Sequence, residues 1–330
     1  MQALVSLCRR MFLVLFAASI AAAAHAAPPG YAAMYVFGDS LSDTGNDLAA
    51  TTNRMVPAIP PSVSPYATYW QGRFSNGPVA VEYLWQMVAR KGTAEVTPIL
   101  ATTDLNKKSA VNFAFGGAGT GEQNLTPKPN QFLVFGLLGQ VGLYKTAMSG
   151  KKPHPGSLYV VWAGANDYLA ELPVPPKVVV GNIVASIEAL HAMGARDFLV
   201  PNLPDLGMTP LVKVRQQSAL FTQLTKTHNE MLATALNGLS GLPGIKIKRL
   251  DVFALGQTLV NSGSVNADMP ALVVVFPDPT VVDCLFRDPS SCKDVPLNKP
   301  IPPFLYWDVL HPTTQVHGII GSAMYNALQK

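Results

Sequence analysis

The chain has 330 residues, of which 48% are hydrophobic and 13% are charged, and its formal net charge is +4. Lysine and arginine contribute 24 charges against 20 acidic residues, and these basic residues form no dense cluster. Because binding to a phosphate backbone needs clustered lysine and arginine, the composition argues against nucleic acid as a partner.

The first 26 residues have the organisation of a secretory signal peptide. An arginine pair precedes the apolar run 11–20, and Ala-His-Ala at 24–26 matches a cleavage site. A membrane anchor would need roughly 18 to 20 apolar residues, which this run does not reach. We therefore expect 27–330 to be exported, periplasmic or secreted, as a soluble chain without a transmembrane anchor. Both the Sec and the twin-arginine export routes are compatible with the arginine pair.

The remaining sequence alternates strand-like runs with helical patterns. Runs that end at Gly, Asn or Asp predict strands at 31–38, 109–116, 157–164, 196–202 and 245–252. Apolar spacing predicts helices near 77–91, 129–148, 178–193, 211–237 and 314–328. Connections rich in proline and glycine predict loops at 51–76, 117–130, 201–210 and 264–303. No linker or repeat marks a boundary, so 27–330 is expected to be a single α/β domain with a mostly parallel sheet between helix layers.

The stretch YVFGDSLSDTGND, residues 35–47, concentrates acidic and small polar residues just after a predicted strand. An EF-hand calcium loop that began at Asp39 would have Leu41 at its third position and Thr44 at its sixth, so the spacing excludes that motif. Ser40 follows Gly38, where the chain can turn tightly. The turn allows two interpretations, a helix N-cap or a nucleophile that faces a cleft.

The stretch DVLH near the other end places Asp308 three residues before His311. This spacing is about one helical turn, so both side chains can face the same way. The carboxylate could then hold the imidazole Nδ1–H while Nε2 takes a proton from a serine hydroxyl. His317, six residues further on, is expected to be a structural residue on a helix.

Acyl transfer at a serine also needs hydrogen-bond donors for the developing oxyanion. The strand-like run at 157–164 leads into Asn166, whose side-chain amide could be such a donor. The run at 109–116 leads into Gly116 and Gly117, whose backbone N–H groups can approach a ligand closely. Neither Gly117 nor Gly119 begins the G-x-G-x-x-G pattern of a dinucleotide site.

Together, GDSLSDTGN (38–46), NFAFGGAGT (112–120), GAND (164–167) and DVLH (308–311) resemble the four blocks of the GDSL subgroup of SGNH hydrolases. The resemblance implies a three-layer α/β/α sandwich with a mostly parallel, flavodoxin-like sheet. It also implies a site that needs no metal or organic cofactor.

Carried over residue by residue, the resemblance makes Ser40 the nucleophile, His311 the base and Asp308 its orienting partner. The oxyanion hole would comprise the N–H of Ser40, a glycine N–H and the side chain of Asn166. Counting along the block favours Gly117 over Gly116, although the choice between the two adjacent glycines stays open. Asp39, beside the serine, is expected to support the turn.

The expected activity is hydrolysis of a small-molecule or lipid ester through an acyl-enzyme on Ser40. The alternatives are an acyltransferase that moves the acyl group to a lipid, sterol or sugar alcohol, and a non-catalytic binding module. Eight aromatic residues are candidates for lining an acyl pocket: Tyr69, Trp70, Phe74, Phe132, Phe135, Phe304, Tyr306 and Trp307.

The cysteines are the last feature with a structural implication. Cys8 leaves with the signal peptide, so Cys284 and Cys292 remain. An even count in an exported chain favours a disulfide between them. A metal site is the alternative, but no further cysteine or histidine lies nearby in the sequence.

Overall fold

The computed structural model describes residues 30–64, 67–89, 95–102, 104–105, 109–125, 132–170, 173–274, 292–294 and 303–330. The expected signal peptide and Cys284 lie outside these residues, so the export signal and the disulfide stay predictions. Within the described residues, no helix is both long enough and apolar enough to cross a membrane.

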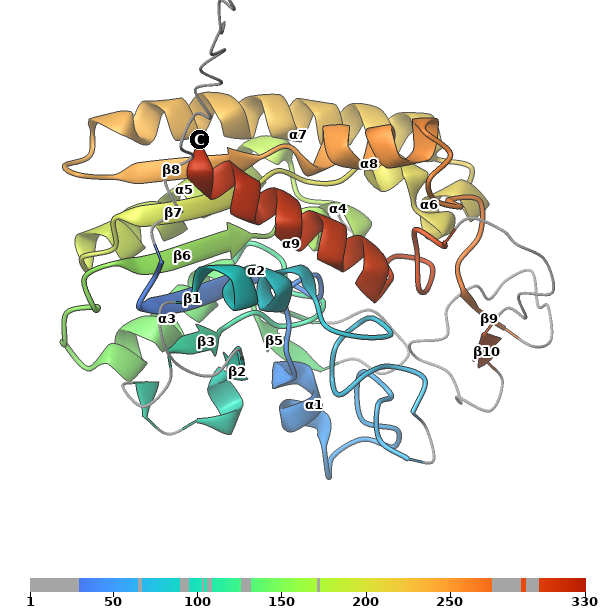
Figure 1. Cartoon of the computed structure of the whole chain (residues 1–330), viewed down its shortest axis with the longest axis horizontal. Helices are drawn as coiled ribbons and strands as arrows, with labels where there is room; N and C mark the ends of the chain where they lie inside the picture. Colours follow the sequence, from blue (N-terminus) through green and yellow to red (C-terminus); the bar gives the residue numbers. More distant parts are fainter. Residues whose placement is uncertain are drawn as a thin grey trace, which may run out of the picture.

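The described part of the chain folds around a six-stranded sheet in which all neighbouring strands are parallel (Figure 1). In spatial order its strands are β2 (Thr97–Pro98), β3 (Ala110–Asn112), β1 (Ala33–Gly38), β6 (Ser157–Trp162), β7 (Asp197–Pro201) and β8 (Lys246–Leu250). Without the two-residue β2, this is the 2-1-3-4-5 order of flavodoxin-like sheets. The predicted α/β fold with a parallel, flavodoxin-like sheet is therefore confirmed.

The central strands are apolar because both of their faces are covered. Along β1, Met34 and Val36 enter one hydrophobic cluster, while Tyr35 and Phe37 enter another on the opposite face. Every residue of β1 and β6 is buried. The alternation of side chains thus splits the core into two layers, one on each side of the sheet.

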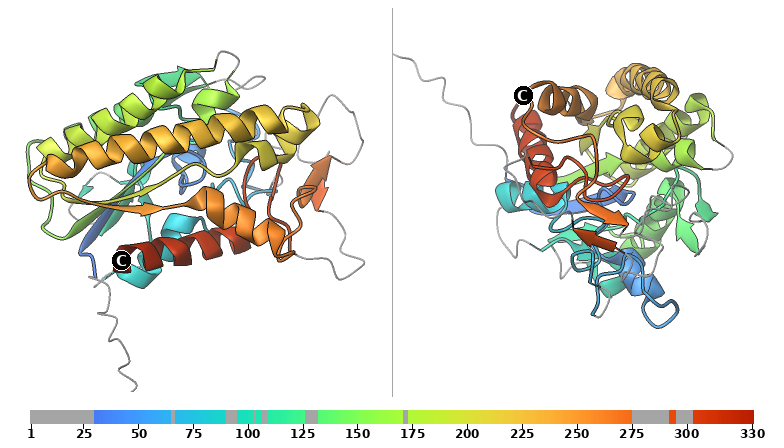
Figure 2. Two further views of the ribbon diagram at one scale, coloured as in Figure 1. Left: turned by 90° about the horizontal axis from the view of Figure 1, so that it is seen from above. Right: turned by 90° about the vertical axis from the view of Figure 1, so that its right-hand side faces the viewer.

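Helices cover both faces, as Figure 2 shows from above and from the side. One face carries α2 (Ala80–Val88), α8 (Val252–Asn261) and α9 (Thr314–Gln329). The other carries α3 (Leu137–Met148), α5 (Pro176–Ala192) and α7 (Ser218–Gly238). This arrangement gives the three layers that the resemblance implied.

Smaller elements connect these strands and helices. Short α-helices are α1 (Asn46–Thr51), α4 (Ala165–Leu169) and α6 (Pro210–Val214). Short 3-10 helices lie at Ile99–Ala101, Leu206–Met208 and Leu239–Gly241. Two antiparallel pairs join β4 (Gln123–Leu125) to β5 (Leu133–Phe135) and β9 (Leu272–Val274) to β10 (Cys292–Asp294).

Several predicted boundaries were wrong. The helix expected near 129–148 begins only at Leu137, because 133–135 form a strand. The helix expected over 211–237 is two helices, since Gln216 between them has a left-handed φ of 56°. The predicted strand 109–116 pairs as a ladder only over 110–112, and α8 was not predicted at all.

Candidate active site

Ser40 lies in a tight turn directly after β1, at the end of the sheet where the strand order reverses between β1 and β6. The turn is closed by the N–H groups of Ser42 and Asp43, which donate to the Asp39 carbonyl at 3.0 Å each. Helix α1 begins six residues later, with Gly45 at its N-cap. Ser40 therefore caps no helix, and its hydroxyl is left for another partner.

Gly38 makes this turn possible at the end of β1. A Cβ at this position would overlap the Trp162 carbonyl of the neighbouring strand. The side-chain amide of Gln140, on α3, accepts from the Gly38 N–H at 2.9 Å and donates to its carbonyl at 2.8 Å. Helix α3 thereby holds the end of β1 that leads to Ser40.

The structure brings Ser40, His311 and Asp308 into one hydrogen-bonded chain. The Ser40 Oγ lies 2.8 Å from Nε2 of His311, and Nδ1 of His311 lies 2.7 Å from Oδ2 of Asp308. Ser40 is 7% exposed, His311 5% and Asp308 1%. With Nδ1–H donating to the carboxylate, Nε2 can accept the serine proton, which is the arrangement an activated serine requires.

Asp308 and His311 are brought together by a bend in the chain. The helical turn that their three-residue spacing predicted does not form there. The segment is irregular, and α9 begins only at Thr314. Oδ1 of Asp308 accepts the backbone N–H groups of Leu310 at 2.8 Å and His311 at 2.7 Å. The aspartate thus shapes the bend that holds the histidine against it.

Tyr69 completes the environment of Asp308, and the sequence did not reveal it. The Tyr69 hydroxyl donates to Oδ2 of Asp308 at 2.7 Å. Burial alone would raise the pKa of Asp308, but the charge of His311 and the hydrogen bonds from His311 and Tyr69 bring that pKa below its ordinary value. Asp308 is therefore a carboxylate at neutral pH.

The two candidate glycines differ in what their N–H groups do. The Gly116 N–H donates to Oδ2 of Asp43 at 3.3 Å. Among the described residues, neither the Gly117 N–H nor the Ser40 N–H has a hydrogen-bond acceptor. Gly117 also has a left-handed φ of 74°, which glycine adopts readily. Of the two glycines, Gly117 is the one with a donor available to a ligand.

Asn166 lies in α4, just after β6, and faces the same cavity as Ser40. Its Nδ2 donates to the Ala118 carbonyl at 3.0 Å. Because a primary amide has two N–H donors, this bond orients the side chain and leaves one donor. Asp167, the next residue, accepts the Thr120 N–H at 2.9 Å and the Thr120 hydroxyl at 2.8 Å, which anchors the glycine loop beyond residue 117.

Asp43 is a further buried residue near the site that sequence reasoning left unassigned. Its Oδ1 accepts the N–H groups of Gly45 and Asn46 at 2.7 Å each, and its Oδ2 accepts those of Asp47 at 3.1 Å and Gly116 at 3.3 Å. The residue stood in the same acidic stretch as Ser40, but nothing local indicated its partner 73 positions away.

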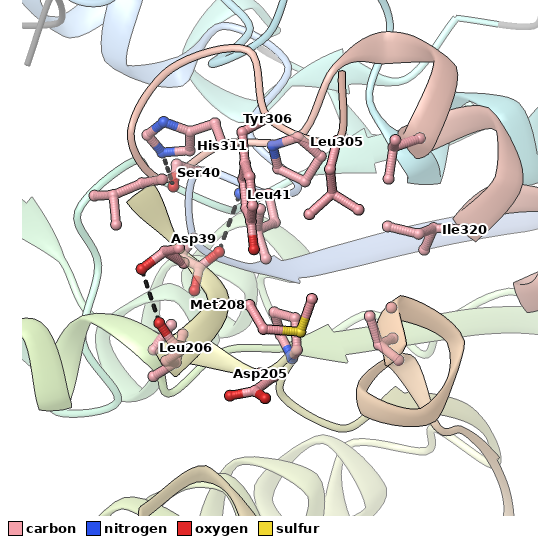
Figure 3. Close-up of a pocket in the computed structure, with 18 of the residues that line it drawn as sticks. Asp39, Ser40, Leu41, Asp205, Leu206, Met208, Leu305, Tyr306, His311 and Ile320 are labelled. Carbon is pink, nitrogen blue, oxygen red and sulfur yellow. Dashed lines mark hydrogen bonds between the residues drawn. The ribbon is translucent and has the colours of Figure 1, made fainter. Parts of the chain in front are cut away.

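Asp39 supports the serine turn as expected, since its Oδ1 accepts the Leu41 N–H at 3.0 Å. Burial raises the pKa of Asp39 to about 7, and that hydrogen bond and the charge of His311 only partly offset the effect. Its carboxyl group faces the cavity beside Ser40 (Figure 3).

The expectation of an aromatic pocket was wrong for all but one of the residues named. Of the eight, only Tyr306 lines the cavity beside Ser40. Tyr69, Phe74, Phe304 and Trp307 pack instead into a separate cluster, in which the Phe74 ring lies 5.2 Å from the His311 imidazole. These aromatics support the histidine segment, and aliphatic side chains surround the cavity.

Comparison with known proteins places this site in a family. Residues 34–324 match the model of the GDSL-like lipase/acylhydrolase family. A phosphatidylcholine-sterol acyltransferase from Aeromonas hydrophila is 25% identical, with 88% of each chain covered. A thermolabile hemolysin from Vibrio parahaemolyticus is 30% identical, covering 87% of this chain and 61% of that one.

Among solved structures, a lipolytic G-D-S-L family member from Veillonella parvula aligns with a TM-score of 0.43 at 11% identity, over 89% of this chain and 94% of that one. The family model spans the sheet and all four motif blocks. The chain belongs to the GDSL-like lipase/acylhydrolase family.

Proposed function

We propose that this protein is an exported serine hydrolase that cleaves carboxylic esters through an acyl-enzyme on Ser40. The observation that carries the proposal is the buried chain of hydrogen bonds from Asp308 through His311 to Ser40. Export rests on the sequence of residues 1–26 alone.

In the first half of the reaction, the Ser40 Oγ attacks the ester carbonyl carbon while Nε2 of His311 takes the hydroxyl proton. Asp308, held as a carboxylate, stabilises the imidazolium that forms. His311 then gives this proton to the leaving alcohol as the carbon–oxygen bond breaks. The acyl group stays on Ser40 as an ester.

In the second half, a water molecule gives a proton to His311 and attacks the acyl-enzyme. The carboxylic acid leaves when the proton returns to the Ser40 oxygen. In both halves, the oxyanion would accept hydrogen bonds from the N–H of Ser40, the N–H of Gly117 and Nδ2 of Asn166. The first two have no acceptor among the described residues, which supports this assignment.

The test is the hydrolysis of p-nitrophenyl esters, from acetate to palmitate, by the mature protein and its Ser40→Ala variant. We expect the variant to lose measurable turnover while its far-UV circular dichroism and melting temperature stay close to wild type. Equal turnover by both proteins would remove Ser40 from the reaction. Inertness of both on every ester would favour a non-catalytic binding module, a role that a relative named as an inactive GDSL esterase/lipase-like protein makes worth testing.

A second candidate activity is acyl transfer to an alcohol, favoured by the similarity to a phosphatidylcholine-sterol acyltransferase. The acyl-enzyme would be the same, and an alcohol would replace water in the second half. Product analysis in the presence of a sterol, a sugar or a short alkanol separates the two activities. Ester formation that exceeds release of free acid would favour the transferase.

A further inference from the structure

An apolar cavity extends from Ser40 and His311 toward the helices α8 and α9 (Figure 3). Ser40 lies at one end of the view and Ile320, on α9, at the other. The walls of the cavity beyond the catalytic end are formed mainly by aliphatic side chains of α8, α9, the segment between them and the 3-10 helix at 206–208: Leu206, Leu255, Leu259, Leu305, Val316 and Ile320. The cavity is therefore continuous with the reacting hydroxyl and suited to a hydrocarbon chain.

Two of the polar residues that line the cavity, Asp205 and Thr209, already have hydrogen-bond partners within the protein. Asp205 accepts hydrogen bonds from the Gly207 N–H, the Thr222 hydroxyl and the Gln257 amide at 3.0, 2.7 and 2.8 Å. The Thr209 hydroxyl donates to the Leu206 carbonyl at 2.8 Å. Since Asp205 and Thr209 require nothing from a ligand, methylene groups can lie beside them without leaving either side chain unsatisfied.

Gly256 is the one position in the α8 wall with no side chain. A Cβ built on Gly256 would meet no other atom within 4 Å. A Cβ can therefore be added here without overlap, at a position that borders the cavity. Because glycine is unfavourable inside a helix, this addition is not expected to weaken α8.

We infer that this cavity binds the acyl chain of the substrate, an aliphatic acyl group, and that Gly256 allows the chain to pass α8. This inference rests on the proposed ester hydrolysis. The acyl group stays bound to Ser40 until water arrives, whereas the alcohol must leave first. A cavity bounded by buried core residues such as Ile320 and Val316 suits the part of the substrate that stays.

The test compares Gly256→Ala and Gly256→Leu with wild type on p-nitrophenyl esters of two to sixteen carbons. Each methylene buried in an apolar site contributes up to about fourfold to kcat/KM. If leucine displaces two or three methylenes, kcat/KM for the longest accepted esters should fall roughly 15- to 60-fold relative to acetate. Gly256→Ala should have a smaller effect in the same direction. Gly142→Leu, on α3 and equally free of overlap, is the matched control and should leave the profile unchanged.

Two further measurements separate this inference from the proposed function. Dodecanoate binding, measured by calorimetry, does not depend on turnover and should weaken in Gly256→Leu but not in Gly142→Leu. For a series of acetate esters with alkyl alcohols of increasing length, the dependence of kcat/KM on the length of the alcohol should be the same in wild type and Gly256→Leu. An unchanged acyl profile and unchanged dodecanoate affinity in Gly256→Leu would overturn the inference, as would a change confined to the alcohol series. Dodecanoate binding that depends on residue 256 in a protein inert on all esters would overturn the proposed hydrolysis but keep the acyl site.

Discussion

The hydroxyl of Tyr69 and the imidazole of His311 donate hydrogen bonds to the same carboxylate oxygen, Oδ2 of Asp308, each at 2.7 Å. Asp308 is 1% exposed, so these donors and the two backbone N–H groups on Oδ1 take the place of water around its charge. We therefore infer that Tyr69 is a positioning residue, which would act on the proposed reaction through Asp308 and His311.

We predict that Tyr69→Phe moves the acid limb of the kcat/KM–pH profile to higher pH. With one donor fewer, the Asp308 carboxylate directs more of its negative charge at the imidazole and favours protonated, inactive His311. Loss of a hydrogen bond to a charged group should also lower the free energy of unfolding by about 1.5–3 kcal/mol. The pH profile with a soluble ester and urea denaturation measure the two effects.

Tyr144→Phe is the control for this variant. Tyr144 is fully buried, and its hydroxyl lies 2.8 Å from that of Tyr159 in the core layer beneath α3, α5 and α7, a different cluster from that of Tyr69. This substitution should lower stability without moving the pH profile. A Tyr69→Phe profile that matches that of Tyr144→Phe would reduce Tyr69 to a structural role.

A second prediction concerns the side chain of Asn166. If its amide stabilises the oxyanion, Asn166→Ala should lower kcat by roughly 100- to 1000-fold with little change in KM, the effect known for one such donor in another serine hydrolase. Asn182→Ala, which removes a different amide bonded to the Thr120 hydroxyl at 3.1 Å, should leave kcat within a few-fold of wild type. Activity of Asn166→Ala in that same range would exclude it as an oxyanion donor.

A third prediction concerns the stability of alanine variants at the two adjacent glycines, Gly116 and Gly117. A Cβ on Gly116 would overlap the Phe74 ring and the Asp47 carboxyl, so Gly116→Ala should destabilise the protein by about 1–3 kcal/mol through overpacking. Gly117→Ala must hold a left-handed φ of 74°, which costs roughly 1–2 kcal/mol. Urea denaturation gives both values. A Gly116→Ala protein as stable as wild type would show that the chain relaxes there.

A fourth prediction follows from Asp47, whose two carboxyl oxygens are buried and lack a hydrogen-bond partner within the described residues. Burial, followed by the charge of Asp43, raises the pKa of Asp47 well above its ordinary 3.8. The folded state therefore binds a proton that the unfolded state has lost, and stability falls as pH rises above about 4.

Asn imitates the protonated form of Asp47 and does not titrate. The free energy of unfolding of Asp47→Asn should thus be close to that of wild type near pH 4. Between pH 5 and 8, the free energy of unfolding of Asp47→Asn should exceed that of wild type by an amount that grows by up to about 1.4 kcal/mol per pH unit. Thermal or urea unfolding of both proteins at several pH values checks this. A difference that stays constant with pH would mean that Asp47 is already ionised in the folded protein.

The sequence predicted those parts of the site that are carried by short local patterns. Ser40 and His311 each lie within a short motif of neighbouring residues that could be identified in the sequence. The strands β1 and β6 could be predicted because each is a continuous apolar run that is buried on both faces. The strand order came only from the family resemblance, since no local pattern specifies which parallel strands are neighbours.

What the sequence could not give depends on contacts between distant segments. Tyr69 lies 239 positions from Asp308, and nothing near residue 69 indicates a carboxylate partner. The aromatic residues near the site were misassigned because their size suits core packing as well as ligand binding, and here they pack around the histidine segment. Leu255 and Ile320 carry the spacing of ordinary helix residues, so their place in the cavity wall emerges only when α8 and α9 are brought together.

The four hydrogen bonds accepted by Asp43 couple two loops that have separate origins in the chain. One carboxylate holds both the segment that follows the serine turn and Gly116, the residue just before the proposed glycine donor. The loop that follows the proposed nucleophile and the loop of the proposed glycine donor therefore share one buried anchor. A change at Asp43 would therefore disturb both loops at once, whereas a change in the helices that border the cavity would leave this anchor in place.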